Sequence, residues 1–358
     1  MPLDDLFDHM KYGQLYMDGR LDGVDLAGRE LQGFPVLRTA FLDAALSGAT
    51  LKSMVFVECD FSRCSFVDSK LHTCQFINCA FVGADLQGAL IERSTLLQCN
   101  AEKSSLSRAN VFMTSMAKTS LAGAGLADVS IEKSSIMECD LSRIDLSRAK
   151  LRNVVMIGAD LRTATIDGLD CDGFMLMEAD LSNRDLRSLK LPRANLMKTS
   201  LAGSNLAGMD LAGSVFMEAN LQRADLSGAK APMALFAGAD LSGASLRNGE
   251  LSLANFEGAN LQAADFGGAK LDMAGLNSAR AAGARFDGAD LSMARFGYSD
   301  LKGAVFSGAR FNMTDLHCAT MDGALSAGAS GSTLPTDQAR AIAELYDPKR
   351  VGAQSEGR

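Results

Sequence analysis

Large apolar residues recur at every fifth position through most of this chain. Residues whose numbers end in 1 or 6, from Leu21 to Met321, are almost all Leu, Phe, Ile, Met or Val. The exceptions are Ala101, Cys171, Ala231 and Ala281. An α-helix repeats every 3.6 residues and a strand every two, so neither explains a period of five. The pattern predicts a stack of short, nearly identical units.

A second, smaller residue precedes each large one by two places. This slot mostly holds Ala, Ser, Cys or Thr, as at Ala84 and Ala239. Asp or Asn often lies between the two, as at Asp85, and Gly often ends the unit, as at Gly88. One large and one small inward side chain can fill a narrow square core. Asp and Asn suit the corner because they bond nearby backbone groups, and Gly relaxes the turn.

The unit A(D/N)LxG resembles that of the pentapeptide-repeat family over about residues 21–323. The resemblance implies an all-β fold, a right-handed quadrilateral β-helix with four units per coil and about 15 coils. We expect short terminal caps, because the end coils of a repeat array expose core and unpaired backbone. Residues 1–20 are predicted to form the N-terminal cap and residues 21–323 the β-helix. Residues 324–358 are predicted to form a linker, a short helix from Leu334-Pro335 to about Tyr346, and a loose tail.

Between 144 and 209 the small slot often holds a larger residue, and Arg184 is the most unusual of these. A close-packed core has no spare width for a ligand pocket, so we interpret this region as compensating repacking. For Arg184 we expect a local bulge of the backbone that frees the side chain.

Outward residues 20 positions apart would stack into columns along such a coil, and one column is apolar. We call it the apolar column; it contains Leu37, Val57, Ile77, Leu97, Ala117, Met137, Ile157, Met177, Met197, Met217 and Ala237. The neighbouring outward column adds Pro35, Val55, Val155, Met175, Val215 and Leu235. A contiguous apolar stripe of several hundred Å² indicates an interaction surface. The candidate interface residues are Leu37, Val57, Ile77, Leu97, Met137, Ile157, Met175, Met177, Met197, Val215, Met217 and Leu235.

Three alternatives remain for what covers this surface. The N-terminal segment could fold over it, although about 20 helical residues span only about 30 Å. A second copy could pair along it to give a homodimer. A different protein could dock there.

The chain carries no recognisable constellation for catalysis, a metal or a cofactor. Six of its eight cysteines, such as Cys59 and Cys139, occupy the small inward slot, Cys171 is central, and Cys318 faces outward. We interpret them as reduced core residues. His9, His72 and His317 lie far apart, and the repeated corner Asp residues lack a desolvating pocket. We therefore expect no enzyme activity.

The net charge of −8 and the pI of about 5 argue against direct binding to nucleic acid. No apolar run is long enough to span a membrane, and the acidic N-terminus does not resemble a secretory signal. We expect a cytoplasmic protein, with export as an effector left open.

We predict a non-enzymatic protein-interaction scaffold that binds itself or a partner through the apolar column. The family resemblance implies a bacterial secretion-associated accessory protein or effector as one context. It also implies an alternative, a DNA mimic that binds the topoisomerase gyrase. DNA carries about one charge per 1.7 Å, whereas −8 along a rod of about 70 Å is roughly one per 9 Å. The scaffold is therefore the first prediction.

Overall fold

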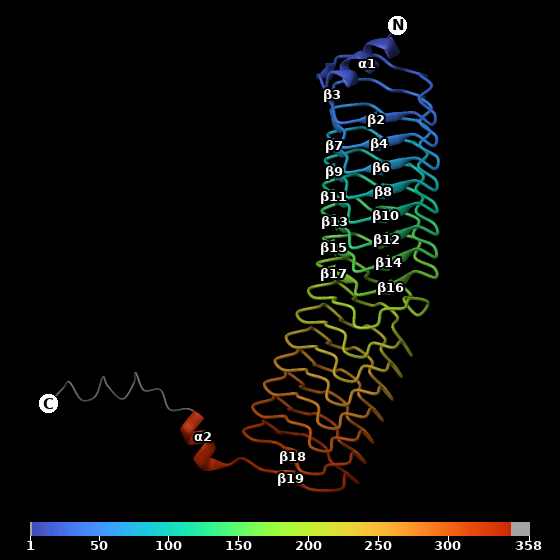
Figure 1. Cartoon of the computed structure of the whole chain (residues 1–358). Helices are drawn as coiled ribbons and strands as arrows, with labels where there is room; N and C mark the ends of the chain where they lie inside the picture. Colours follow the sequence, from blue (N-terminus) through green and yellow to red (C-terminus); the bar gives the residue numbers. More distant parts are fainter. Residues whose placement is uncertain (1, 345–358) are drawn as a thin grey trace, which may run out of the picture. The chain divides into compact units, whose positions relative to one another are not determined.

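The computed structural model describes residues 2–344. The chain folds as a mostly-β solenoid of about 16 turns with few helices, close to the 15 coils predicted. It divides into two compact units, Met1–Asn220 and Leu221–Arg358, which are described in turn. Figure 1 shows the coils stacked within each unit.

Unit 1 contains two parallel sheets, one on each of two neighbouring sides of the coil. The nine-stranded sheet comprises β1 (Tyr16–Met17), β3 (Pro35–Leu37), β5 (Val55–Val57), β7 (Gln75–Ile77), β9 (Thr95–Leu97), β11 (Ser115–Ala117), β13 (Ser135–Met137), β15 (Val155–Ile157) and β17 (Met175–Met177). The eight-stranded sheet comprises β2 (Glu30–Gln32), β4 (Thr50–Lys52), β6 (Lys70–His72), β8 (Leu90–Glu92), β10 (Asn110–Phe112), β12 (Ser130–Glu132), β14 (Lys150–Arg152) and β16 (Asp170–Asp172).

The pairing register confirms a coil of four units. Each strand pairs with the strand 20 residues away, as where Val36 lies beside Phe56 and Leu37 beside Val57. In every three-residue strand of the nine-stranded sheet the central residue is buried and its two neighbours face outward, because side chains alternate across a strand.

The core is filled as the repeat predicts, by one large and one small side chain per unit. Phe61 is fully buried and its ring stacks on the rings of Phe41 and Phe81, with centroids 4.8 and 5.2 Å apart. The small slot holds buried residues such as Ala84 and Cys64. Large residues from successive coils therefore stack in columns, and the small ones leave them room.

The Asp and Asn residues bond nearby backbone as predicted, but they lie in the backbone ladder just before the turn and not at the corner. Asp85 pairs with Ser65 and Ser105, and the turn falls at Gln87 and Gly88. The Asp85 carboxylate accepts a hydrogen bond from the backbone N–H of Gln87 at 3.0 Å, and Asp60 accepts one from Ser62 at 2.9 Å. The last residue of the unit adopts a positive φ, 68° at Gly88 and 43° at Arg38. Glycine adopts this conformation without a steric penalty, and other residues adopt it at some cost.

Helix α1 (Pro2–Lys11) lies on the N-terminal end of unit 1 (Figure 1). Leu6 is 1% exposed, and the guanidinium of Arg29 in the first coil lies 5.9 Å from the ring of Phe7. The helix thereby covers apolar groups that the first coil would otherwise leave in water.

Arg184 is half-buried, and its guanidinium donates a hydrogen bond to the Arg162 carbonyl oxygen at 2.8 Å. Its charge is thus satisfied by backbone from the preceding coil and does not enter the core. Nearby, Cys171 occupies a slot that usually holds a large residue and Phe174 one that usually holds a small residue. Both side chains are buried, so the core accommodates this pair.

Unit 2 is also built of 20-residue coils, but its backbone ladder is thinner. Its coils are joined by isolated parallel bridges, from Asp225 with Ser245 to Arg310 with Ser330. Two short strands, β18 (Thr314–Asp315) and β19 (Thr333–Leu334), pair at its end.

The ladder therefore runs beyond residue 323, where the apolar register was expected to end. Large central residues are missing at Ser326 and Gly331, but backbone pairing to the previous coil does not need them. The predicted helix start at Leu334-Pro335 is wrong, because Leu334 belongs to strand β19. The helix, α2, spans Gln338–Glu344. The predicted helix end near Tyr346 and the tail 347–358 lie outside the described residues.

Candidate functional site

The apolar column lies on the outer side of the nine-stranded sheet in unit 1. Its members from Leu37 to Met177 are the last residues of β3 to β17, aligned by the strand pairing. The column continues after β17, because the Glu178 and Lys198 amides donate to the carbonyl oxygens of Met197 and Met217 at 3.1 and 3.0 Å. Ten predicted positions of the column thus form one line within unit 1.

These side chains are half-buried, not fully exposed. From Leu37 to Met217 each lies between the side chains of the coils before and after it, about 4.8 Å away. Met175, in the neighbouring column, is more open at 38% exposed. In unit 2, Leu235 of the neighbouring column is 36% exposed. Twenty residues further on both columns become polar, with Asn255 after Leu235 and Glu257 after Ala237. The column is therefore a continuous apolar strip whose side chains are partly shielded from water by their neighbours in the adjacent coils.

Two corners border this face and differ in charge. One carries acids and bases; we call it the acid–base corner, and it contains Asp18, Arg38, Glu58, Asn78, Gln98, Lys118, Glu138, Gly158, Glu178, Lys198 and Glu218. The other has bases and no acids; we call it the basic corner, and it contains Gly33, Ser53, Thr73, Arg93, Met113, Lys133, Asn153, Gly173, Arg193 and Gly213. An apolar strip with a charged rim is the usual anatomy of a protein-binding surface.

Sequence reasoning missed two apolar features. Met17 pairs with Leu37 in β1 and extends the column by one coil, with 45% of its surface exposed. Subtracting 20 from Leu37 would have found it. In unit 2 a line of exposed apolar residues occupies successive corners; it contains Met233, Leu253, Met273, Met293 and Met313. The same period of 20 would have revealed this line.

Cover by the N-terminal helix is excluded as the occupant of the column. Helix α1 packs against the first coil through Leu6 and Phe7 and does not run along the sheet (Figure 1). Among residues 2–344 the column keeps its half-exposed state from Leu37 to Met217. A second copy and a different protein remain as occupants.

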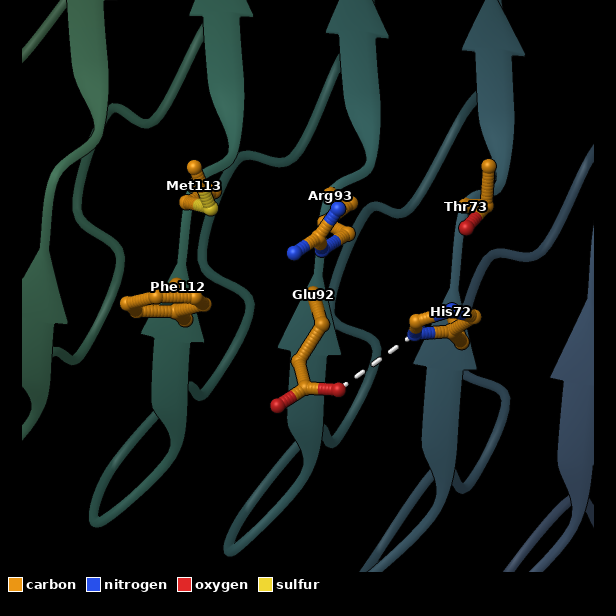
Figure 2. A pocket seen from close by; sticks show the side chains of 6 residues that line it. All are labelled: His72, Thr73, Glu92, Arg93, Phe112 and Met113. Carbon is orange, nitrogen blue, oxygen red and sulfur yellow. Dashed lines mark hydrogen bonds and ion pairs between the residues drawn. The ribbon is translucent and has the colours of Figure 1, made fainter.

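A shallow depression lies beside this face, on the eight-stranded sheet. Figure 2 shows its six side chains, from the ends of β6, β8 and β10; they are His72, Thr73, Glu92, Arg93, Phe112 and Met113. His72 Nδ1 lies 3.3 Å from Glu92 Oε2, and both side chains are more than a third exposed. The depression is the space between side chains of successive coils, open to water, and lacks the desolvation that catalysis needs.

The cysteines lie where the repeat predicted. All eight are free; seven are buried and Cys318 is half-buried. Burial raises the pKa of Cys64 to about 12 and that of Cys74 to about 11, which disfavours the reactive thiolate. Within residues 2–344 no group of three or more His, Cys, Asp or Glu side chains could hold a metal ion. Nor does that part of the chain contain a helix long and apolar enough to cross a membrane.

His317 has a structural environment that the sequence did not predict. It is 1% exposed; its Nδ1 accepts a hydrogen bond from the Asp337 amide at 3.2 Å, and its Nε2 lies 3.1 Å from Glu344 Oε2. Tyr298 also bonds Glu344. These contacts attach α2 to the last coils of unit 2.

Several acids of unit 1 are paired with arginines of a neighbouring coil. Arg63 donates to both carboxylate oxygens of Asp43 at 2.7 and 2.8 Å, and Arg148 does the same with Asp128. The arginines lower the pKa of both carboxyl groups. At these paired positions the surface does not carry the continuous negative charge of a DNA backbone.

Comparisons with known proteins concern the repeat. A family model described as pentapeptide repeats matches residues 44–81, 139–183, 194–230, 234–272, 259–297 and 289–325, which is more than half of the chain. No curated protein matches the chain in sequence.

Several solved structures are similar. QnrB1, a plasmid-mediated fluoroquinolone resistance protein, is 19% identical, with 53% of this chain and 92% of that one covered and a TM-score of 0.35. HetL, involved in heterocyst differentiation regulation in the cyanobacterium Nostoc sp. strain PCC 7120, is 21% identical, with 92% and 94% covered and a TM-score of 0.14. A pentapeptide repeat protein of the Arabidopsis thaliana thylakoid lumen is 28% identical, with 31% and 67% covered and a TM-score of 0.25.

Proposed function

Because this chain belongs to the pentapeptide-repeat family, we propose that it is a non-enzymatic scaffold that binds protein through the apolar column of unit 1. The observation that carries this proposal is the unbroken line of half-buried apolar side chains from Leu37 to Met217, which follows the nine-stranded sheet and continues past its last strand, β17. Binding there would remove apolar surface from water without any rearrangement of the coils. Methionines at four of the ten positions suit contact with an uneven partner surface.

A gyrase-binding DNA mimic is the weaker alternative. Its surface would need a run of unpaired acids, whereas Asp18, Asp43 and Asp128 are each bonded to an arginine. A role in a bacterial secretion system would be one cellular context of this scaffold, in which the same apolar column would be the binding surface.

The chain offers a matched pair of variants to test the proposal. Val57 and Val82 are both half-buried outward valines directly after a buried Phe, but only Val57 lies on the nine-stranded sheet. We expect Val57→Asp to lose cross-linked protein adducts in the cells of origin, because a carboxylate in an apolar contact is left desolvated and unpaired. Val82→Asp should keep the adducts of the wild type. Equal adducts in both variants, or none in the wild type, would refute the proposal.

A further inference from the structure

On the face that carries the apolar column, the charges and side-chain sizes of one half complement those of the other half. Reversing the order of the coils about a point between β11 and β13 exchanges Ala117 with Met137, and the corner residue Lys118 with Glu138. A surface that is complementary to its own reversed copy is what a two-fold dimer requires, since each contact between two different residues then occurs twice, once in each direction.

We infer that the partner is a second copy of this chain, packed antiparallel on the same face about a two-fold axis between β11 and β13. This inference rests on the proposed function and names the occupant of that site. With the axis perpendicular to the strand stack and in the plane of the contact, the acid–base corner of one copy meets the acid–base corner of the other.

The charges on that corner are complementary in this register. Lys118 faces Glu138 of the second copy, and the reverse contact repeats it. Glu58 likewise faces Lys198, and Arg38 faces Glu218. Within one copy the Lys118 and Glu138 side chains are only 3.9 Å apart but 58% and 70% exposed, so both can reach across the rim. Rim charges of this kind set orientation and register.

A shift of the partner by one coil destroys this match. With the axis centred on Ala117, Lys118 would face itself, Glu58 would face Glu178, and Arg38 would face Lys198. Every charged pair on the corner would then be repulsive. Like charges juxtaposed at an interface select against the wrong arrangement.

The apolar column fits itself in the same register. Small residues meet large ones, with Ala117 against Met137 and Val57 against Met197. The remaining contacts are medium against medium or large: Leu97 with Ile157, Ile77 with Met177, and Leu37 with Met217. Alternating small and large residues across a contact lets two strips interdigitate.

The basic corner, on the other side of the face, brings no like charges together in this register. On the basic corner Arg93 faces Asn153, Arg193 faces Ser53, and Lys133 faces Met113. Two bases never meet. Figure 2 shows Arg93 and Met113, with Thr73, in one row just past the ends of β8, β10 and β6.

The buried area is enough for a reversible dimer. Nine coil steps at about 4.8 Å and three residues at about 3.3 Å give a strip of roughly 43 by 10 Å on each copy. The two copies together would bury about 900 Å² before the rim is counted, close to the roughly 1,000 Å² of a specific interface. We therefore expect concentration-dependent self-association.

The test uses the full chain and rescue between two variants. Lys118→Glu alone places two glutamates opposite each other, and Glu138→Lys alone places two lysines opposite each other. In sedimentation equilibrium each variant should dimerise about tenfold or more weakly than the wild type. Mixing the two variants should restore association to near the wild-type level, because each charge then meets its opposite across the interface. Mixing leaves the contacts within each chain unchanged, so recovery requires that these corners meet across the two copies. The weakening of both single variants selects the register, because with the axis centred on Ala117 neither variant would add a repulsive pair.

Lys103→Glu is the control, since it makes the same charge change on an exposed corner away from this face. It should associate like the wild type, and circular dichroism should show all variants folded. A monomeric wild type at about 100 μM, or a mixture no stronger than its components, would overturn the inference. If the wild type is monomeric but Val57→Asp still loses adducts that Val82→Asp keeps, the binding face stands and the second copy is wrong.

Discussion

Phe61→Ala should remove a large part of the stability of the N-terminal coils. The Phe61 ring is fully buried and lies within 4.8 to 6.0 Å of five other phenylalanine rings, measured between centroids. Truncation of a buried Phe to Ala costs about 3–5 kcal/mol, and more where the surroundings cannot close on the cavity.

Here the surroundings are held open by the backbone ladder. The Phe61 amide donates to the Ala80 carbonyl at 2.7 Å, and the Asp60 amide donates to Thr39 at 3.0 Å. Both neighbouring coils are therefore fixed at the strand spacing, and collapse would break these bonds. We expect a loss of about 4 kcal/mol for Phe61→Ala and about 1–1.5 kcal/mol for Phe61→Leu, which keeps most of the volume.

Urea denaturation followed by far-ultraviolet circular dichroism gives the free energy of unfolding, and hydrogen exchange locates the change. Coils contact only their neighbours, so exchange should rise around residues 41–81 and stay unchanged in residues 241–310. A loss below about 1.5 kcal/mol for the alanine variant would contradict the assumption of a rigid, unrelaxed cavity. A uniform rise in exchange across both ranges would contradict the nearest-neighbour character of the stack.

Three further outcomes are expected. Ala101→Val should raise the free energy of unfolding by about 0.5–1 kcal/mol, because Ala101 lines an apolar void of about 20 Å³ in the core; a loss would mean that the coil cannot accept the added methyls. A thiol reagent at neutral pH should modify Cys318 alone in the native protein and all eight cysteines in denaturant, as counted by mass spectrometry. Bonds from Tyr298 and Arg340 lower the pKa of Glu344 from 4.5 to about 2. The stability that these bonds give α2 is thus present above pH 4.5 and is lost as the pH falls toward 2. Hydrogen exchange in Gln338–Glu344 should rise over that range, and a flat profile would show that the carboxylate does not hold the helix.

The sequence predicted the repeat unit and its packing with little error. A coil this narrow admits two inward side chains per unit, so every core position must obey the same size rule, and the rule is visible in the chain itself. That is why the buried state of Cys64, the bonding of Asp85 and the turn at Gly88 could all be anticipated. The line of the apolar column followed from the five-residue period together with the four units per coil that the family resemblance implied, which place Leu37 beside Val57.

Features at the ends depended on contacts that no period describes. The packing of α1 on the first coil, the burial of His317 under α2 and the ladder beyond Met321 join residues by tertiary proximity and backbone pairing. The sequence determined which residues face outward on one line. The tertiary structure decided that this line is half-shielded by its own neighbours and left uncovered by α1, because exposure depends on what packs beside a side chain as well as on its direction.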